Sequence, residues 1–146
     1  MNGGEAIGSG GFGCIFNPNI KCKNKSVKSS KNMISKLMVN KHIDTEINEI
    51  KKIKTIIVDN IKNYEKYFIL DNIYSCKPDI LTKTDLRFFD EKCKNLTKKN
   101  ITKKNINKQL HKIGIINMPY GGTSLNTYMK NILLNNLNIK YFDNVN

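Results

Sequence analysis

The sequence predicts an α+β fold, in which a twisted antiparallel β-sheet carries one main helix. The first forty residues are rich in glycine and β-branched residues, as in short strands joined by turns. Isoleucines recur at helical spacing after Asp44, and a further apolar run covers Ile113 to Met118. The chain has 146 residues, of which 39% are hydrophobic, enough for the core of one domain.

Three strands are predicted at the start of the chain: Glu5 to Gly8, Gly13 to Phe16 and Met33 to Met38. In each run apolar residues and turn residues follow one another as in short, half-buried strands. Pro18 and the polar stretch from Lys23 to Asn32 predict a loop between the second strand and the third.

One amphipathic helix is predicted from Asp44 to Ile57. Apolar residues recur there every three or four positions, with Lys and Glu between them. Asp44 and Thr45 are candidates for its N-cap. The apolar run from Tyr67 to Leu70 then predicts a short buried strand.

Residues 71–109 have neither a helical nor a strand period, and they include the near-repeat TKKNITKKNIN at 97–107. We interpret this Lys/Asn-rich stretch as a surface insertion that is partly helical around Leu81 to Phe89. A buried strand from Ile113 to Met118, a short linker and an amphipathic helix near Leu125 follow.

The chain is strongly basic, with 25 Lys and Arg against 12 Asp and Glu and a formal net charge of +13. Arg87 is its one arginine. Surfaces that bind nucleic acids ordinarily mix in arginine, whose guanidinium contacts phosphate and guanine through two hydrogen bonds. Abundant Lys, Asn and Ile also fit a bias toward A/T-rich codons, so a solvated basic surface is favoured over nucleic-acid binding.

The four cysteines are Cys14, Cys22, Cys76 and Cys93, and no two have the close spacing of zinc ligands. A structural metal is therefore not predicted. The chain does not open with a basic segment followed by an apolar one, and no apolar run is long enough to span a membrane. We expect an intracellular protein that is not secreted, with reduced and mostly buried thiols.

The most informative motif is Ile7-Gly-Ser-Gly-Gly-Phe-Gly-Cys-Ile15, which contains G-x-G-x-x-G. In a dinucleotide-binding fold the third glycine of this motif opens a helix. Here Gly13 is followed by an alternating run that soon meets Pro18, which favours a strand. The turn is therefore predicted to join two antiparallel strands and to let backbone amides approach phosphate. A glycine-rich hairpin without a ligand is the alternative.

A lysine inside an apolar strand is the second motif. Lys36 lies within Ile34-Ser-Lys-Leu-Met38, where burial of an ammonium is costly unless it has anionic partners. The predicted helix that follows offers two, Glu46 and Glu49, which lie three residues apart. The alternatives are a lysine that faces water and two glutamates on a solvated helix face.

The third motif, Ile115-Ile-Asn-Met-Pro-Tyr-Gly-Gly-Thr-Ser-Leu125, is typical of a strand, an extended linker and a new helix. Together the motifs resemble the small lobe of a eukaryotic-type serine/threonine protein kinase. The words GSGGFGCIF, ISKLM, NYEKYFI and INMPYGG are more specifically similar to kinase-like proteins of giant nucleocytoplasmic DNA viruses, as is the composition. The resemblance covers about Glu5 to Tyr128 apart from the insertion. It implies a small lobe at 1–122 and the start of a large lobe at 123–146.

The resemblance implies an ATP site, with Mg²⁺ as its companion. Lys36 would contact the α- and β-phosphates and pair with Glu49, which is nearer the family's spacing, or with Glu46. Met118 would be the gatekeeper, and the linker backbone would bond the adenine edge. The implied ATP-binding residues are Ile7, Gly8, Ser9, Gly10, Gly11, Phe12, Gly13, Cys14, Ile15, Lys36, Met118, Pro119, Tyr120 and Gly121. A viral kinase would act in the host cytoplasm or reside in the virion.

Phosphoryl transfer also needs a catalytic-loop Asp and Asn and the Asp of a D-F-G triplet. None of these follows the linker: His42-Ile43-Asp44 lacks the arginine of H-R-D, and Asp143 precedes no Phe-Gly pair. We therefore expect an ATP-binding lobe that lacks the protein ligands of Mg²⁺ and is inactive alone. Its expected partners are ATP and either a protein substrate or the missing large lobe. The alternatives are a non-catalytic, pseudokinase-like docking module and a basic nucleic-acid-binding protein.

Overall fold

The fold is built on one five-stranded sheet. The computed structural model describes residues 4–23 and 30–142; most of the predicted loop at 23–32, and Asp143, lie outside these ranges. The strands have the order β1-β2-β3-β5-β4, and each neighbouring pair is antiparallel. Their bounds are β1 Glu5–Ser9, β2 Gly13–Asn17, β3 Met33–Val39, β4 Tyr74–Cys76 and β5 Ile113–Pro119. The predicted α+β class is confirmed.

The main helix, α1 (Asn40–Asn60), begins directly where β3 ends. It does not start at the predicted Asp44, and neither Asp44 nor Thr45 is its N-cap. The N-cap is Val39, which makes no side-chain cap hydrogen bond. Because Val39 is still paired with Ile113 of β5, the strand leads into the helix without a loop. Sheet pairing therefore determines where the helix starts.

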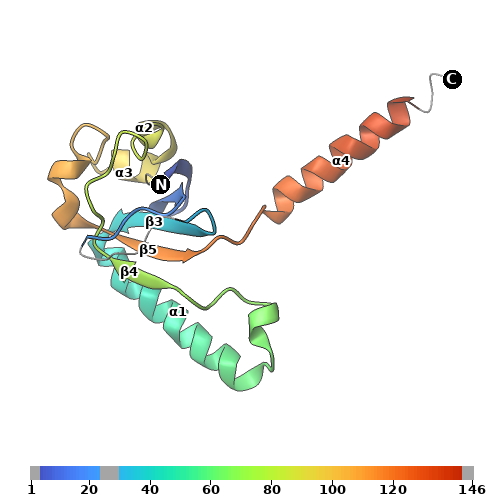
Figure 1. Cartoon of the computed structure of the whole chain (residues 1–146), viewed down its shortest axis with the longest axis horizontal. Helices are drawn as coiled ribbons and strands as arrows, with labels where there is room; N and C mark the ends of the chain where they lie inside the picture. The colour runs from blue at the N-terminus through green and yellow to red at the C-terminus, as the bar shows by residue number, and fades with distance from the viewer. Residues whose placement is uncertain (1–3, 24–29, 143–146) are drawn as a thin grey trace.

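One face of the sheet is covered by α1 (Figure 1). Ile43 of this helix is buried and packs with Met38 of β3 and Ile116 of β5. The helix can come this close because Gly114 of β5 has no side chain. A Cβ at Gly114 would lie 3.2 Å from Ile43 Cγ1, tighter than an ordinary van der Waals contact.

Residues 81–112 cover the opposite face. They form α2 (Phe89–Lys92), α3 (Lys94–Thr97) and the 3-10 turns η2 (Ile106–Lys108) and η3 (Leu110–Lys112). Their apolar side chains join Phe16 and Leu37 of the sheet in the main core. The buried residues of this stretch include Leu81, Phe89, Leu96, Ile101 and Ile106. The prediction of a surface insertion is therefore wrong, because this stretch supplies much of the core.

The strand predicted at Tyr67 to Leu70 is also wrong. These residues follow a single 3-10 turn, η1 (Tyr64–Lys66), and Tyr67 and Ile69 are exposed. The remaining strand, β4, lies at Tyr74–Cys76, inside the predicted insertion, and pairs with β5. A run of four apolar residues has no period that would reveal which side is buried, so its burial could not be judged from the sequence.

Two disulfide bonds join distant parts of the chain. Cys14 is bonded to Cys93 across 79 residues, and Cys22 to Cys76 across 54. The expectation of reduced thiols is therefore wrong for this structure. Packing of residues 81–112 on the sheet brings Cys93 to Cys14 of β2. An isolated bridge between Cys22 and Pro78 brings Cys22 close to Cys76 at the end of β4.

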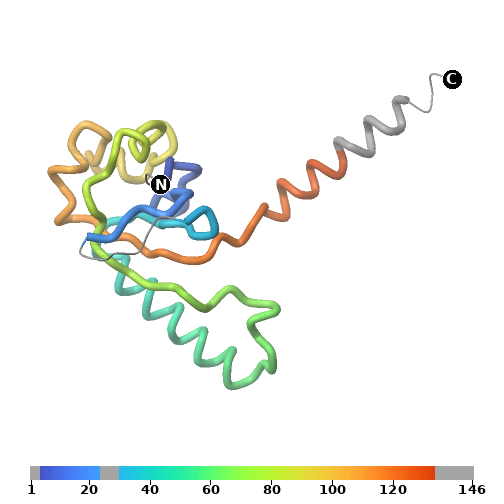
Figure 2. The backbone as a smooth tube through the Cα atoms, in the orientation of Figure 1, coloured from blue at the N-terminus to red at the C-terminus, as the bar shows by residue number. Residues whose placement is uncertain are grey.

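The last helix, α4 (Leu125–Phe142), leads away from the sheet (Figures 1 and 2). It occupies the place of the helix predicted near Leu125. Tyr128, Met129 and Leu133 on it are exposed. Over the described ranges of the chain, we find no helix with the length and apolar character that crossing a membrane requires.

Candidate functional site

The glycine-rich stretch forms the turn between β1 and β2. Gly10 N–H donates to the Gly13 carbonyl over 2.9 Å, and Gly13 opens β2 rather than a helix, as predicted. A Cβ on Gly13 would lie 2.5 Å from the Leu37 carbonyl oxygen, so glycine is required where β2 approaches β3. A Cβ on Gly8 or Gly11 would meet open space. The hairpin therefore packs closely against β3 at Gly13, whereas the space beside Gly8 and Gly11 is open.

Lys36 lies in the middle of β3 and projects from the face that α1 covers. Its cross-strand partners are Ile15 of β2 and Ile116 of β5, and residues paired in register share a face. Lys36 Nζ donates to both carboxylate oxygens of Glu46, at 2.6 Å each. The two side chains are 20% and 22% exposed. The predicted anionic partner of this strand lysine is therefore present.

The partner of Lys36 is the alternative, Glu46, and not the favoured Glu49. Glu49 is exposed. At 100° per residue, Glu46 lies about 60° around the helix axis from the buried Ile43, whereas Glu49 lies about 120° away. The pairing predicted for Glu49 is wrong because Glu46 lies nearer the side of α1 that packs on the sheet through Ile43, whereas Glu49 is turned away from it.

The tip of the glycine-rich turn reaches α1. The ring of Phe12 lies against the ring of His42, with centroids 4.9 Å apart. His42 precedes Glu46 by one helical turn, so Phe12 stands on the side of the sheet that carries the ion pair. Partial burial, and then the positive charges of Lys99 and Lys41, hold the pKa of His42 below its ordinary 6.5. The imidazole is therefore neutral at physiological pH.

The predicted linker follows β5, whose last residues include Met118 on the same face of the sheet as Lys36. Met118 pairs in register with Ile34 of β3, and both belong to the face of Lys36. The strand includes Pro119, one residue more than predicted. Tyr120 N–H then donates to the Asn32 carbonyl over 2.9 Å, which anchors the linker to the turn before β3.

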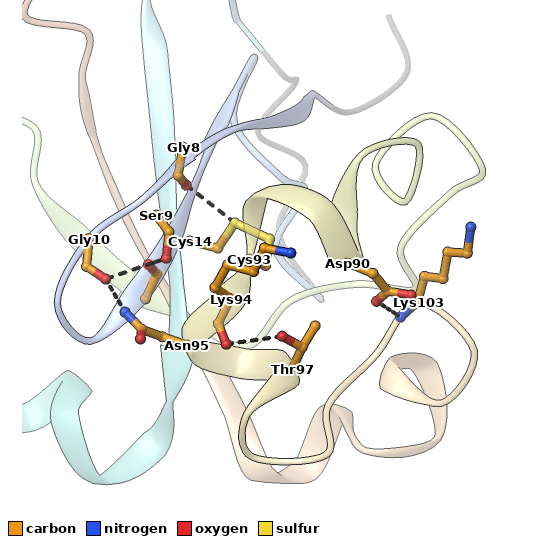
Figure 3. The surroundings of a disulfide bond; sticks show 11 residues. Gly8, Ser9, Gly10, Cys14, Asp90, Cys93, Lys94, Asn95, Thr97 and Lys103 are labelled. Atoms are coloured by element: carbon orange, nitrogen blue, oxygen red, sulfur yellow. Dashed lines mark hydrogen bonds between the residues drawn. A yellow bond between two sulfur atoms is a disulfide. The ribbon is translucent and has the colours of Figure 1, made fainter.

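Two residues that the sequence did not reveal hold the glycine-rich turn from the other face (Figure 3). Asn95 Nδ2 donates to the carbonyl of Gly10 and, over 3.0 Å, to that of Gly11. Cys93 forms its disulfide with Cys14. Because Cys14 points to this outer face, its side chain does not line the implied ATP site. Asn95 begins an Asn-Leu-Thr triplet at the edge of a low-complexity stretch, and nothing in the sequence connects it to the glycine-rich turn.

The residues of the site do not fit a protein-held metal. Over the described parts of the chain, no group of three or more His, Cys, Asp or Glu side chains converges. Glu46, the carboxylate beside Lys36, is already engaged by that ammonium. The donor set therefore does not match what Mg²⁺ requires, and no chemical step is routed through it.

A hollow of about 360 Å³ lies between the start of α1 and β4, where Asn40, Ile43 and Ser75 are among its lining residues. It holds none of the motif residues. We therefore define the site by its chemistry: the glycine-rich turn, the ion pair and the linker lie on one face of the sheet.

Comparison with protein-family models, with curated proteins and with solved structures found no match to this chain.

Proposed function

We propose that the chain is the ATP-binding small lobe of a serine/threonine protein kinase-like protein. The observation that carries the proposal is the ion pair between Lys36 and Glu46 next to a glycine-rich hairpin. A lysine in this position can hold phosphate oxygens while the glutamate fixes its side chain. The strand order and the linker after β5 are compatible with the same interpretation.

Each part of the face has a role in this proposal. Ile15 and the half-exposed Ile7 would cover the adenine ring from above, and Met118 would close the back of the pocket. The backbone of the linker at Pro119 to Gly121 would bond the edge of the base. The amides of the glycine-rich turn and Lys36 would bind the phosphates. The proposal is nucleotide binding, without phosphoryl transfer by this chain alone.

Docking on another protein is the second candidate function. It is favoured by apolar side chains that stand exposed on the linker and along α4. These are Tyr120, Leu125, Tyr128, Met129 and Leu133. Such a contiguous series would be covered if this end of the chain bound a partner.

Titration with ATP tests the proposal. We expect ATP to raise the melting temperature of the wild-type chain, and Lys36→Ala to lower the affinity at least about tenfold. Lys52→Ala removes an exposed lysine of α1 and serves as the matched charge control, with unchanged affinity expected. No effect of ATP on the wild type would contradict the proposal and leave docking as the better candidate. Binding to generic DNA with a steep salt dependence would favour the nucleic-acid alternative.

A further inference from the structure

The glycine-rich turn is held by a side chain from residues 81–112, the stretch that covers the face of the sheet opposite α1. Asn95 of α3 donates its amide hydrogens to the carbonyls of Gly10 and Gly11, the residues at the tip of the turn. Two residues earlier, Cys93 is covalently joined to Cys14 near the start of β2. Figure 3 shows both attachments reaching the hairpin from the same short helical segment. Asn95 is therefore held in place by the disulfide.

The hydrogen bonds from Asn95 determine which way the amides of the turn point. The peptide bonds that follow Gly10 and Gly11 are trans. In a planar trans peptide the C=O and the following N–H point in opposite directions. With both carbonyls turned toward Asn95, the N–H groups of Gly11 and Phe12 point away from α3.

The side to which these amides point is the side of the ion pair. Cys14, which faces α3, and Ile15, which is in register with Lys36, are successive residues of β2 and project to opposite faces. Over the described part of the chain, the N–H groups of Gly11 and Phe12 have no hydrogen-bond partner. Two free donors and a lysine ammonium are thus directed to one side of the hairpin, a combination that favours a polyanion.

The tip is also held from below. Phe12 follows the two glycines whose carbonyls accept hydrogen bonds from Asn95, and its ring lies against that of His42 of α1. The turn therefore has an attachment on each side, Asn95 above the sheet and His42 beneath it. A turn with two adjacent glycines otherwise has great conformational freedom, and each attachment reduces the entropy that a ligand must remove on binding.

We propose that Asn95 is a positioning residue for phosphate recognition: it holds the glycine-rich turn so that the Gly11 and Phe12 amides face the phosphate chain of a nucleoside triphosphate. Asn95 acts through the backbone of the turn and does not touch the ligand. The proposal rests on the proposed function, because it assigns a role within the same nucleotide site. It predicts that Asn95 matters for the phosphates and not for the nucleoside.

The test compares ATP with adenosine in isosteric variants of the full chain. Asn95→Asp keeps the shape of the side chain but replaces the donor with a carboxylate that repels the two carbonyls. Asn100→Asp makes the same charge change at an exposed position of the same stretch and serves as the control. We expect Asn95→Asp to weaken ATP at least about tenfold and to change adenosine less than about twofold, with Asn100→Asp unchanged for both.

Hydrogen exchange supplies a readout that does not depend on ligand. Amides 8–13 should exchange faster in Asn95→Asp than in Asn100→Asp, while those of β3 and β5 keep their protection. Unchanged ATP affinity in Asn95→Asp overturns the inference and leaves the proposed function in place. Equal losses for ATP and adenosine also overturn it, since they indicate general damage. If the wild-type chain does not bind ATP, whether or not it binds adenosine, both the proposed function and this inference fail.

Discussion

Lys36 Nζ lies 2.6 Å from each carboxylate oxygen of Glu46, and this pair joins β3 to α1 on the face of the glycine-rich hairpin. The two residues are ten positions apart in the sequence, and β3 continues directly into α1 without a loop. The ammonium is therefore held near the turn before any ligand arrives. Such preorganisation lowers the entropic cost of binding an anion.

Removing Glu46 tests whether this pair stabilises the fold. We expect Glu46→Ala to lower the free energy of unfolding by about 1–2 kcal/mol, since it leaves a half-buried ammonium without its charged partner. Glu49→Ala, one turn further along the exposed side of α1, should change it by less than about 0.5 kcal/mol. Urea denaturation measures both. Equal effects of the two substitutions would show that the pair has no special weight.

The stretch at 81–112 should behave as core and not as insertion. Phe89 is fully buried, whereas its neighbour Phe88 is 38% exposed. Phe89→Ala should therefore destabilise the fold by about 3–5 kcal/mol, because it leaves a cavity against Phe16 and Leu37. Phe88→Ala is the matched control and should cost much less. Thermal unfolding by circular dichroism compares the two, and similar melting temperatures would contradict the packing described.

The two disulfides should make distinct contributions. Peptide mapping without reductant should recover Cys14 with Cys93 and Cys22 with Cys76, and no other pairing. Each bond closes a long loop and so lowers the conformational entropy of the unfolded chain. We expect each to raise the free energy of unfolding by about 4 kcal/mol. The double variant Cys14→Ser/Cys93→Ser should also speed hydrogen exchange at 8–14. Cys22→Ser/Cys76→Ser, the control, should leave that exchange near wild type.

Gly13 and Gly10 should respond differently to alanine. A Cβ at Gly13 would meet the Leu37 carbonyl oxygen at 2.5 Å, whereas one at Gly10 meets nothing within 4 Å. Gly13→Ala should therefore separate β2 from β3 and lower the free energy of unfolding by about 1–3 kcal/mol. Gly10→Ala should stay within about 1 kcal/mol of wild type. Chemical denaturation tests this, and equal losses would contradict the close approach of the strands.

The pKa of His42 should lie below its ordinary 6.5, because partial burial and nearby Lys99 and Lys41 disfavour the imidazolium. A lowered folded-state pKa means that the unfolded chain takes up the proton first. The stability that His42 contributes is therefore complete above about pH 6.5 and declines as pH falls through the folded pKa. Proton NMR of the imidazole measures the pKa directly. Phe12→Ala should raise it by exposing the ring, whereas no change would rule out burial against Phe12 as its cause.

Much of the fold is predictable because its signals are local. The glycines at 8–13 and Pro18 punctuate the first hairpin, and apolar runs mark β3 and β5. A lysine within the apolar β3 run is by itself enough to indicate a charged partner. Each of these signals depends on a few neighbouring residues, so it can be recognised from the amino-acid sequence alone.

Tertiary structure decided the rest, because those choices depend on contacts between distant segments. Pairing of Val39 with Ile113 continues β3 up to the start of α1 at Asn40. Packing of Ile43 on the sheet then places Glu46, and not Glu49, beside Lys36. Burial of residues 81–112 followed from packing on a sheet face, which their irregular spacing does not reveal. Asn95 holds the glycine-rich turn 85 residues away for the same reason: only the folded sheet brings α3 and the hairpin together.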